Sequence, residues 1–149
     1  MAFLAAFLLA AQNAGAEDLA GRCAAPGDDD RTASIPAALA PKAAALFGFP
    51  ASAIGFVAKS TVYRCMGGAV WLCNSGANLT CAKADVSRVS EGAAAFCRAN
   101  PGARVVPMVA TGHDTIFSWE CVAEKPRITG AEQVDGRGFI ANQWKRLDR

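Results

Sequence analysis

Residues 62–73 have the sequence VYRCMGGAVWLC, in which two largely apolar runs flank Gly67 and Gly68. Glycine accepts the positive φ angles of a tight turn, so this stretch predicts an antiparallel hairpin. A two-residue loop sets the register, and the expected pairs are Met66–Ala69, Cys65–Val70, Arg64–Trp71 and Tyr63–Leu72. Cys65 and Cys73 then lie on opposite faces, so we do not expect them to bond to each other.

Two helices are expected outside this hairpin. The first helix is expected over residues 36–47, which begin with a proline that suits a first helical turn. We expect Ser34 to cap this helix and Gly48 to end it. A second helix follows Asp85, with Ser90 as its cap and residues 100–102 (Asn-Pro-Gly) as its end. Residues 17–34 carry turn chemistry and little to bury, which predicts an irregular arm.

Further strands are expected in the second half of the chain. Residues 115–121 alternate, which places Phe117, Trp119 and Cys121 on a buried side. Residues 104–110 are apolar enough for a strand, although Pro107 restricts it to an edge or a bulge. Asp135-Gly136 predicts a last hairpin between residues 128–134 and 138–144. The fold class is therefore α+β: a small antiparallel sheet of about four to six strands built from hairpins, with two short flanking helices and disulfide staples.

The first sixteen residues predict a signal peptide. Ala2–Ala11 form an uncharged apolar run, and Ala14-Gly15-Ala16 is a small-x-small cleavage site before Glu17. The run is too short to span a bilayer, so we expect no stable membrane insertion after cleavage. Residues 17–60 are then an amino-terminal arm with a short helix, packed on a cysteine-stapled core over residues 61–149 as one domain.

Six cysteines follow the leader, an even number that predicts disulfides in an exported, oxidised protein. Their spacing contains no CxxC or CxxCH motif. Cys65 and Cys121 both end an aromatic-x-Cys pattern and both point inward, which favours a bridge between them. The complete expectation is Cys65–Cys121, Cys81–Cys97 and Cys23–Cys73.

Composition excludes several classes of function. The net charge of +2 is too small and too evenly spread to indicate nucleic-acid binding. The chain has a single histidine, His113, and its thiols are expected to be oxidised, so we expect no metal site. The sequence contains no cofactor motif, so we expect no cofactor. No catalytic residue is assigned.

A set of short motifs resembles a known family. The motifs are Val62–Gly68 with Cys73, Gly76–Cys81, Pro107–Val109 with Thr111–Ile116, Trp119–Cys121 and Val134–Ala141. Together they resemble a family of small, exported, uncharacterised proteins of alphaproteobacteria, over roughly residues 61–144. The resemblance implies a periplasmic or secreted location and a framework of five of the six cysteines, and it implies no activity. Thr80 stands where this pattern would have proline.

Three functions are compatible with these observations. The favoured one is an exported, non-catalytic, disulfide-stabilised binding or interaction protein of the cell envelope, whose partner is an envelope protein or a glycan. Its candidate binding residues are Arg64, Trp71, Asn78, His113 and Asp114. The alternatives are a small periplasmic hydrolase that uses His113 and Asp114 with Ser75 or Ser118, and a purely structural envelope protein.

Overall fold

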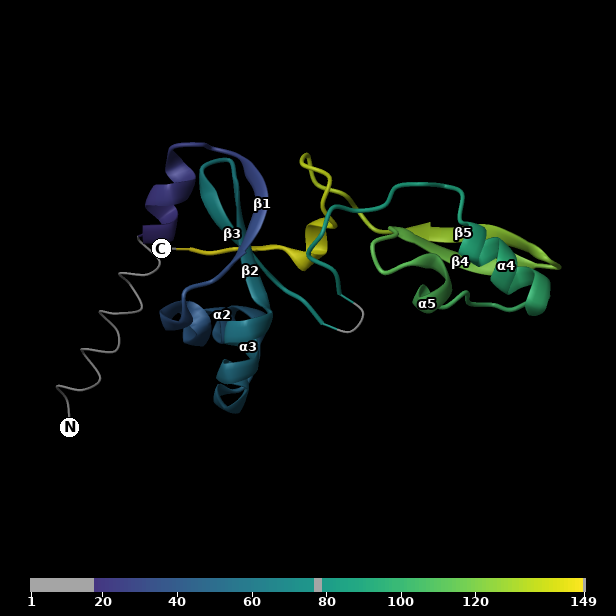
Figure 1. The fold of residues 1–149 in the computed structure, drawn as a ribbon, viewed down its shortest axis with the longest axis horizontal. Coiled ribbons are helices and arrows are strands. Elements are labelled where there is room, and N and C mark those ends of the chain that lie inside the picture. The colour runs from purple at the N-terminus through teal and green to yellow at the C-terminus, as the bar shows by residue number, and fades with distance from the viewer. Residues whose placement is uncertain (1–17, 77–78, 149) are drawn as a thin grey trace. The chain divides into compact units, whose positions relative to one another are not determined.

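The computed structural model describes residues 18–76 and 79–148, and the chain divides into two compact units (Figure 1). Unit 1 contains the described residues up to Gly76 and those from Gln143 onward, and unit 2 contains those between them. The boundary expected after residue 60 therefore falls inside unit 1. The expected leader, residues 1–16, and Asn78 lie outside the described residues.

Unit 1 is built on an antiparallel sheet with the order β1-β2-β3-β6 (Figure 1). The strands are β1 (Asp29–Ser34), β2 (Thr61–Met66), β3 (Ala69–Asn74) and β6 (Lys145–Arg146). The β2–β3 hairpin has the predicted register, with Arg64 opposite Trp71. Gly67 and Gly68 have φ angles of 58° and 71°, which confirms the expected turn.

Helices follow β1 in unit 1: η1 (Ala37–Leu39), α2 (Ala40–Phe47), η2 (Ala51–Ala53) and α3 (Ile54–Ser60). The helix expected over residues 36–47 is confirmed, with a 3-10 first turn, and Gly48 ends it in the left-handed conformation. The cap expected from Ser34 is wrong, because Ser34 is the last residue of β1 and Pro36 occupies the cap position.

The irregular arm expected over residues 17–34 is also wrong. Residues 18–24 are helical, and residues 29–34 form β1, which pairs with β2. Leu19 and Cys23 from this helix are buried in the core of unit 1 beside Leu39, Val57 and Leu72. The segment has little apolar surface of its own, so its structure depends on this long-range burial and on a disulfide from Cys23 to Cys65.

Unit 2 contains α4 (Glu91–Ala99), α5 (Met108–Thr111), β4 (Phe117–Val122) and β5 (Lys125–Ala131). Ser90 caps α4 as predicted, since its hydroxyl accepts a hydrogen bond from the Ala93 amide at 3.1 Å. Trp119 and Cys121 are buried with Ala93 and Cys97, which confirms the predicted inward side of this strand. The chain then returns to unit 1 through η3 (Ala141–Gln143).

Two strand predictions in unit 2 need correction. Residues 104–110 are not a strand: Val106 donates a backbone hydrogen bond to Trp119 along the edge of β4, and α5 begins at Met108 after Pro107. The hairpin expected around Asp135-Gly136 is reduced to one bridge between Val134 and Ile140, because residues 125–131 pair with β4 instead. The Trp119 strand therefore belongs to a separate two-stranded sheet.

All six cysteines lie among the described residues, and all are in disulfides: Cys23–Cys65, Cys73–Cys81 and Cys97–Cys121. The three pairings expected from the sequence are therefore wrong. Cys65 and Cys121 do point inward, but into the cores of different units, and each bonds to a helical cysteine of its own core. The fold is α+β and disulfide-stapled, as expected.

Candidate functional site

Arg64 is one of the residues that the sequence put forward for binding, and it is fully buried. Its guanidinium lies 4.5 Å from the centre of the Trp144 ring, and its Nη1 lies 3.7 Å from the Met66 sulfur. A guanidinium held over an aromatic face gains cation–π attraction, which is strongest away from water. Arg64 is therefore not presented at the surface to a partner, and its contacts are those of a structural residue.

Trp71, the other aromatic candidate, is half-buried on β3. Its indole N–H donates to the Met66 carbonyl oxygen at 3.2 Å, so the polar edge of the ring is used within the hairpin. Binding by the rest of the ring stays a prediction.

His113 and Asp114 are both exposed on the connection between α5 and β4. The Asp114 carbonyl oxygen accepts a hydrogen bond from the Asp85 amide at 2.6 Å, and the Thr115 hydroxyl accepts one from the Phe117 amide. These bonds are typical of a turn that satisfies backbone groups. In the described part of the chain, no cluster of three or more His, Cys, Asp or Glu side chains could hold a metal ion.

The two serines considered for a hydrolase have different surroundings. The Ser75 hydroxyl donates to the Ser60 carbonyl oxygen at 3.0 Å, and Ser75 belongs to unit 1 whereas His113 belongs to unit 2. Ser118 is exposed on β4, in the same unit as His113. A nucleophile needs an oriented base within hydrogen-bond reach, so catalysis by these residues stays a prediction.

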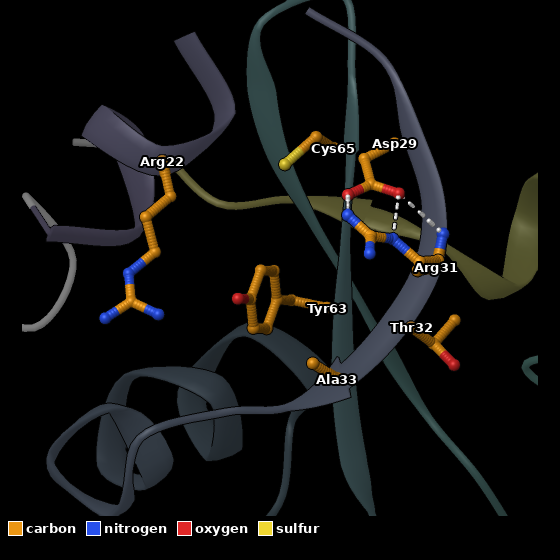
Figure 2. A pocket seen from close by; sticks show the side chains of 7 residues that line it. All are labelled: Arg22, Asp29, Arg31, Thr32, Ala33, Tyr63 and Cys65. Carbon is orange, nitrogen blue, oxygen red and sulfur yellow. Dashed lines mark hydrogen bonds and ion pairs between the residues drawn. The ribbon is translucent and has the colours of Figure 1, made fainter. Parts of the chain in front are cut away.

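A different set of residues forms a hollow of about 400 Å³ in unit 1 (Figure 2). We call it the Tyr63 hollow, and its lining residues are Arg22, Asp29, Arg31, Thr32, Ala33, Tyr63 and Cys65. They come from the helix at residues 18–24, from β1 and from β2. None of the five binding residues put forward from the sequence is among them.

Tyr63 lies between Arg22 and the Asp29–Arg31 ion pair in this hollow, and Arg22 is itself in an ion pair with Asp18, which is not a lining residue (Figure 2). One pair joins Arg31 to Asp29, with Nε 3.1 Å from Oδ1 and Nη2 2.9 Å from Oδ2. The other joins Arg22 to Asp18, with 3.0 Å between Nη2 and Oδ2. The ring itself is half-buried and packs against the core of unit 1.

These contacts change the pKa of the charged groups. Hydrogen bonds from Arg31 stabilise the ionised Asp29 carboxyl and lower its pKa. The charge of the nearby Asp18 carboxylate raises the pKa of Arg22, and a hydrogen bond to Tyr63 adds to this effect. Arg22, Arg31 and Asp29 are therefore fully charged near neutral pH.

The Cys23–Cys65 disulfide connects two walls of the hollow. Cys23 follows Arg22 on the helix at residues 18–24, and Cys65 lines the hollow from β2. A covalent bond between these elements restricts how far Arg22 can move from the sheet. The backbone elements that form these two walls are thus held together by a covalent bond.

This hollow is not expected from the sequence, because an irregular arm over residues 17–34 would not supply the walls that the helix at residues 18–24 and β1 form. One available signal was the spacing of Asp29 and Arg31, since residues two apart on a strand share one face and their charges can pair. The other available signal was Tyr63, which is the one tyrosine in the chain. No pattern in the sequence brings Arg22 close to either.

No family model, curated protein or solved structure matches this chain. Within residues 18–76 and 79–148, no helix has the length and apolar character needed to cross a membrane.

Proposed function

We propose that the protein is an exported, non-catalytic binding protein of the bacterial cell envelope, and that its ligand is held at the Tyr63 hollow. The observation that carries this proposal is the hollow itself, in which a half-buried aromatic ring lies between Arg22 and the Asp29–Arg31 ion pair. Ligand sites commonly combine a concave surface, an aromatic wall and a few oriented polar groups.

Disulfide bonding supports the proposed location. Disulfides form and persist in oxidising compartments, and every cysteine of this chain is in one. A periplasmic or secreted location follows if the leader at residues 1–16 directs export, and the resemblance to exported proteins of alphaproteobacteria agrees with it. In this proposal the disulfides keep the recognition surface rigid, because the hydrophobic core of so small a protein would not do so alone.

The test is a binding assay with washed bacterial cell envelopes. The mature chain, labelled and with its three disulfides intact, is incubated with the envelopes and then sedimented. We expect saturable binding that unlabelled protein displaces. Tyr63→Ala should lower the bound fraction, whereas Val109→Ala, which changes an exposed side chain of unit 2, should not.

Two outcomes would overturn the proposal. Absence of saturable binding would favour a purely structural protein. Release of soluble fragments from the envelopes over time, abolished by His113→Ala, would replace it with the hydrolase alternative.

A further inference from the structure

We infer that the Tyr63 hollow recognises the face of a neutral sugar in an oligosaccharide. This inference rests on the proposed function and names the chemical class of its ligand. Three properties of the hollow support this inference: its aromatic wall, the pairing of both its arginines with carboxylates, and its hydrogen-bonding groups.

The aromatic wall is the phenol ring of Tyr63. Tyr63 is partly buried, packs against the core of unit 1 and also lines the hollow. A pyranose ring has a flat patch of C–H groups that stacks on such a ring, because both surfaces are apolar and the aromatic face is electron-rich. Ordering the ring on binding costs little entropy, because a tyrosine side chain has only two torsions to fix and Tyr63 already packs against the core.

Charge balance argues against a free anion as the ligand. Arg22 and Arg31 carry two positive charges, and their partners Asp18 and Asp29 carry two negative charges. An anion would have to compete with a carboxylate that already holds Arg31 in a two-point ion pair. A neutral ligand leaves both pairs intact.

The same ion pairs offer donors and acceptors side by side. A guanidinium has five N–H donors, and two nitrogens of Arg31 are directed at Asp29, which leaves further donor capacity at Nη1. Asp29 oxygens have several lone pairs, and the exposed Thr32 hydroxyl can donate or accept. Sugar hydroxyls do both, so they match a rim of mixed polarity better than a phosphate or an apolar group does.

The test is a titration of the isotope-labelled mature protein, followed by amide and side-chain NMR signals. The probes are N-acetylated chitotriose and cellotriose as neutral oligosaccharides, with trigalacturonate and inorganic phosphate as anionic comparisons. We expect saturable shifts from a neutral probe at Tyr63, Arg31 and Thr32, and weaker effects from both anions at equal concentration.

Two variants separate stacking from hydrogen bonding. Tyr63→Ala should weaken binding of the neutral probe by about tenfold, because it removes the ring. Tyr63→Phe keeps the ring and should retain most of the affinity. The dispersion of the NMR signals of each variant shows whether unit 1 is still folded. If Tyr63→Ala does not fold, Tyr63→Phe still tests the contribution of the Tyr63 side chain.

Stronger binding of phosphate or trigalacturonate would overturn the inference, as would shifts from the neutral sugars that map outside the hollow. If envelopes bind the protein through Tyr63 but neither neutral oligosaccharide does, the sugar inference fails and the binding function stands. If envelopes do not bind, the proposed function fails.

Discussion

The Arg64 guanidinium lies 4.5 Å from the centre of the Trp144 ring, and both residues are buried. Arg64 is on β2, and Trp144 directly precedes β6 near the carboxyl end of the chain. This contact holds the last segment of unit 1 against the hairpin that organises it. The backbone bond from the Leu147 amide to the Val70 carbonyl oxygen secures the same segment.

Trp144→Ala should therefore destabilise unit 1 by about 3–5 kcal/mol, since it removes a large buried ring and leaves the Arg64 charge without its aromatic face. Trp144→Phe keeps an aromatic face and should cost less. Amide hydrogen exchange in β2 and β3 measures the effect within unit 1. Equal protection in the wild type and Trp144→Ala would contradict this account.

Two helical glycines give a matched pair of predictions. A Cβ at Gly92 of α4 would lie 1.8 Å from the Ala110 carbonyl oxygen of α5, so Gly92→Ala forces the two helices apart. We expect a loss of about 1–3 kcal/mol in unit 2. A Cβ at Gly55 of α3 meets nothing within 4 Å, so Gly55→Ala should stabilise unit 1 by about 0.4–1 kcal/mol. Urea unfolding of each variant checks both signs, and a loss at Gly55 as large as that at Gly92 would show that steric contact is not the cause.

Two of the three disulfides, Cys23–Cys65 and Cys97–Cys121, each lie within one unit, so removing either should affect that unit alone. A non-reducing peptide map should recover Cys23 with Cys65 and Cys97 with Cys121, and recovery of Cys65 with Cys121 would refute the structure. Replacing both Cys23 and Cys65 by alanine should cost about 4 kcal/mol, because their bond spans 42 positions of the chain. The same change at Cys97 and Cys121, which are 24 positions apart, should cost about 3.5 kcal/mol. Amide exchange should report the first loss in unit 1 and the second in unit 2.

Asp29 provides a prediction that depends on pH. Its pKa is lowered in the folded protein by hydrogen bonds from Arg31, so the stabilisation is present above the unfolded pKa of about 3.9 and is lost as the pH falls through the folded pKa. Arg31→Gln should return the pKa of Asp29 toward its ordinary value. Carboxyl ¹³C shifts recorded against pH measure it. Arg127→Gln removes an arginine that pairs with Glu120 in unit 2 and should leave the titration of Asp29 unchanged.

Features that depend on neighbouring residues could be predicted from the sequence. The β2–β3 register follows from Gly67 and Gly68, because a two-residue turn leaves one way to pair the strands that it joins. The cap of α4 follows from Ser90, whose hydroxyl reaches an amide three residues later. The inward side of β4 follows from simple alternation of its residues.

Features that depend on distant contacts were decided only by the tertiary structure. Residues 18–24 are helical and residues 29–34 pair as β1 because Leu19 and Cys23 are buried in a core supplied by other segments. The inward direction of Cys65 and Cys121 was predictable, but not that each faces a separate core and a different partner. The candidate site belongs to this second group: Tyr63, Arg22 and Arg31 come together because a disulfide and a shared core position three elements, and no local pattern records that arrangement.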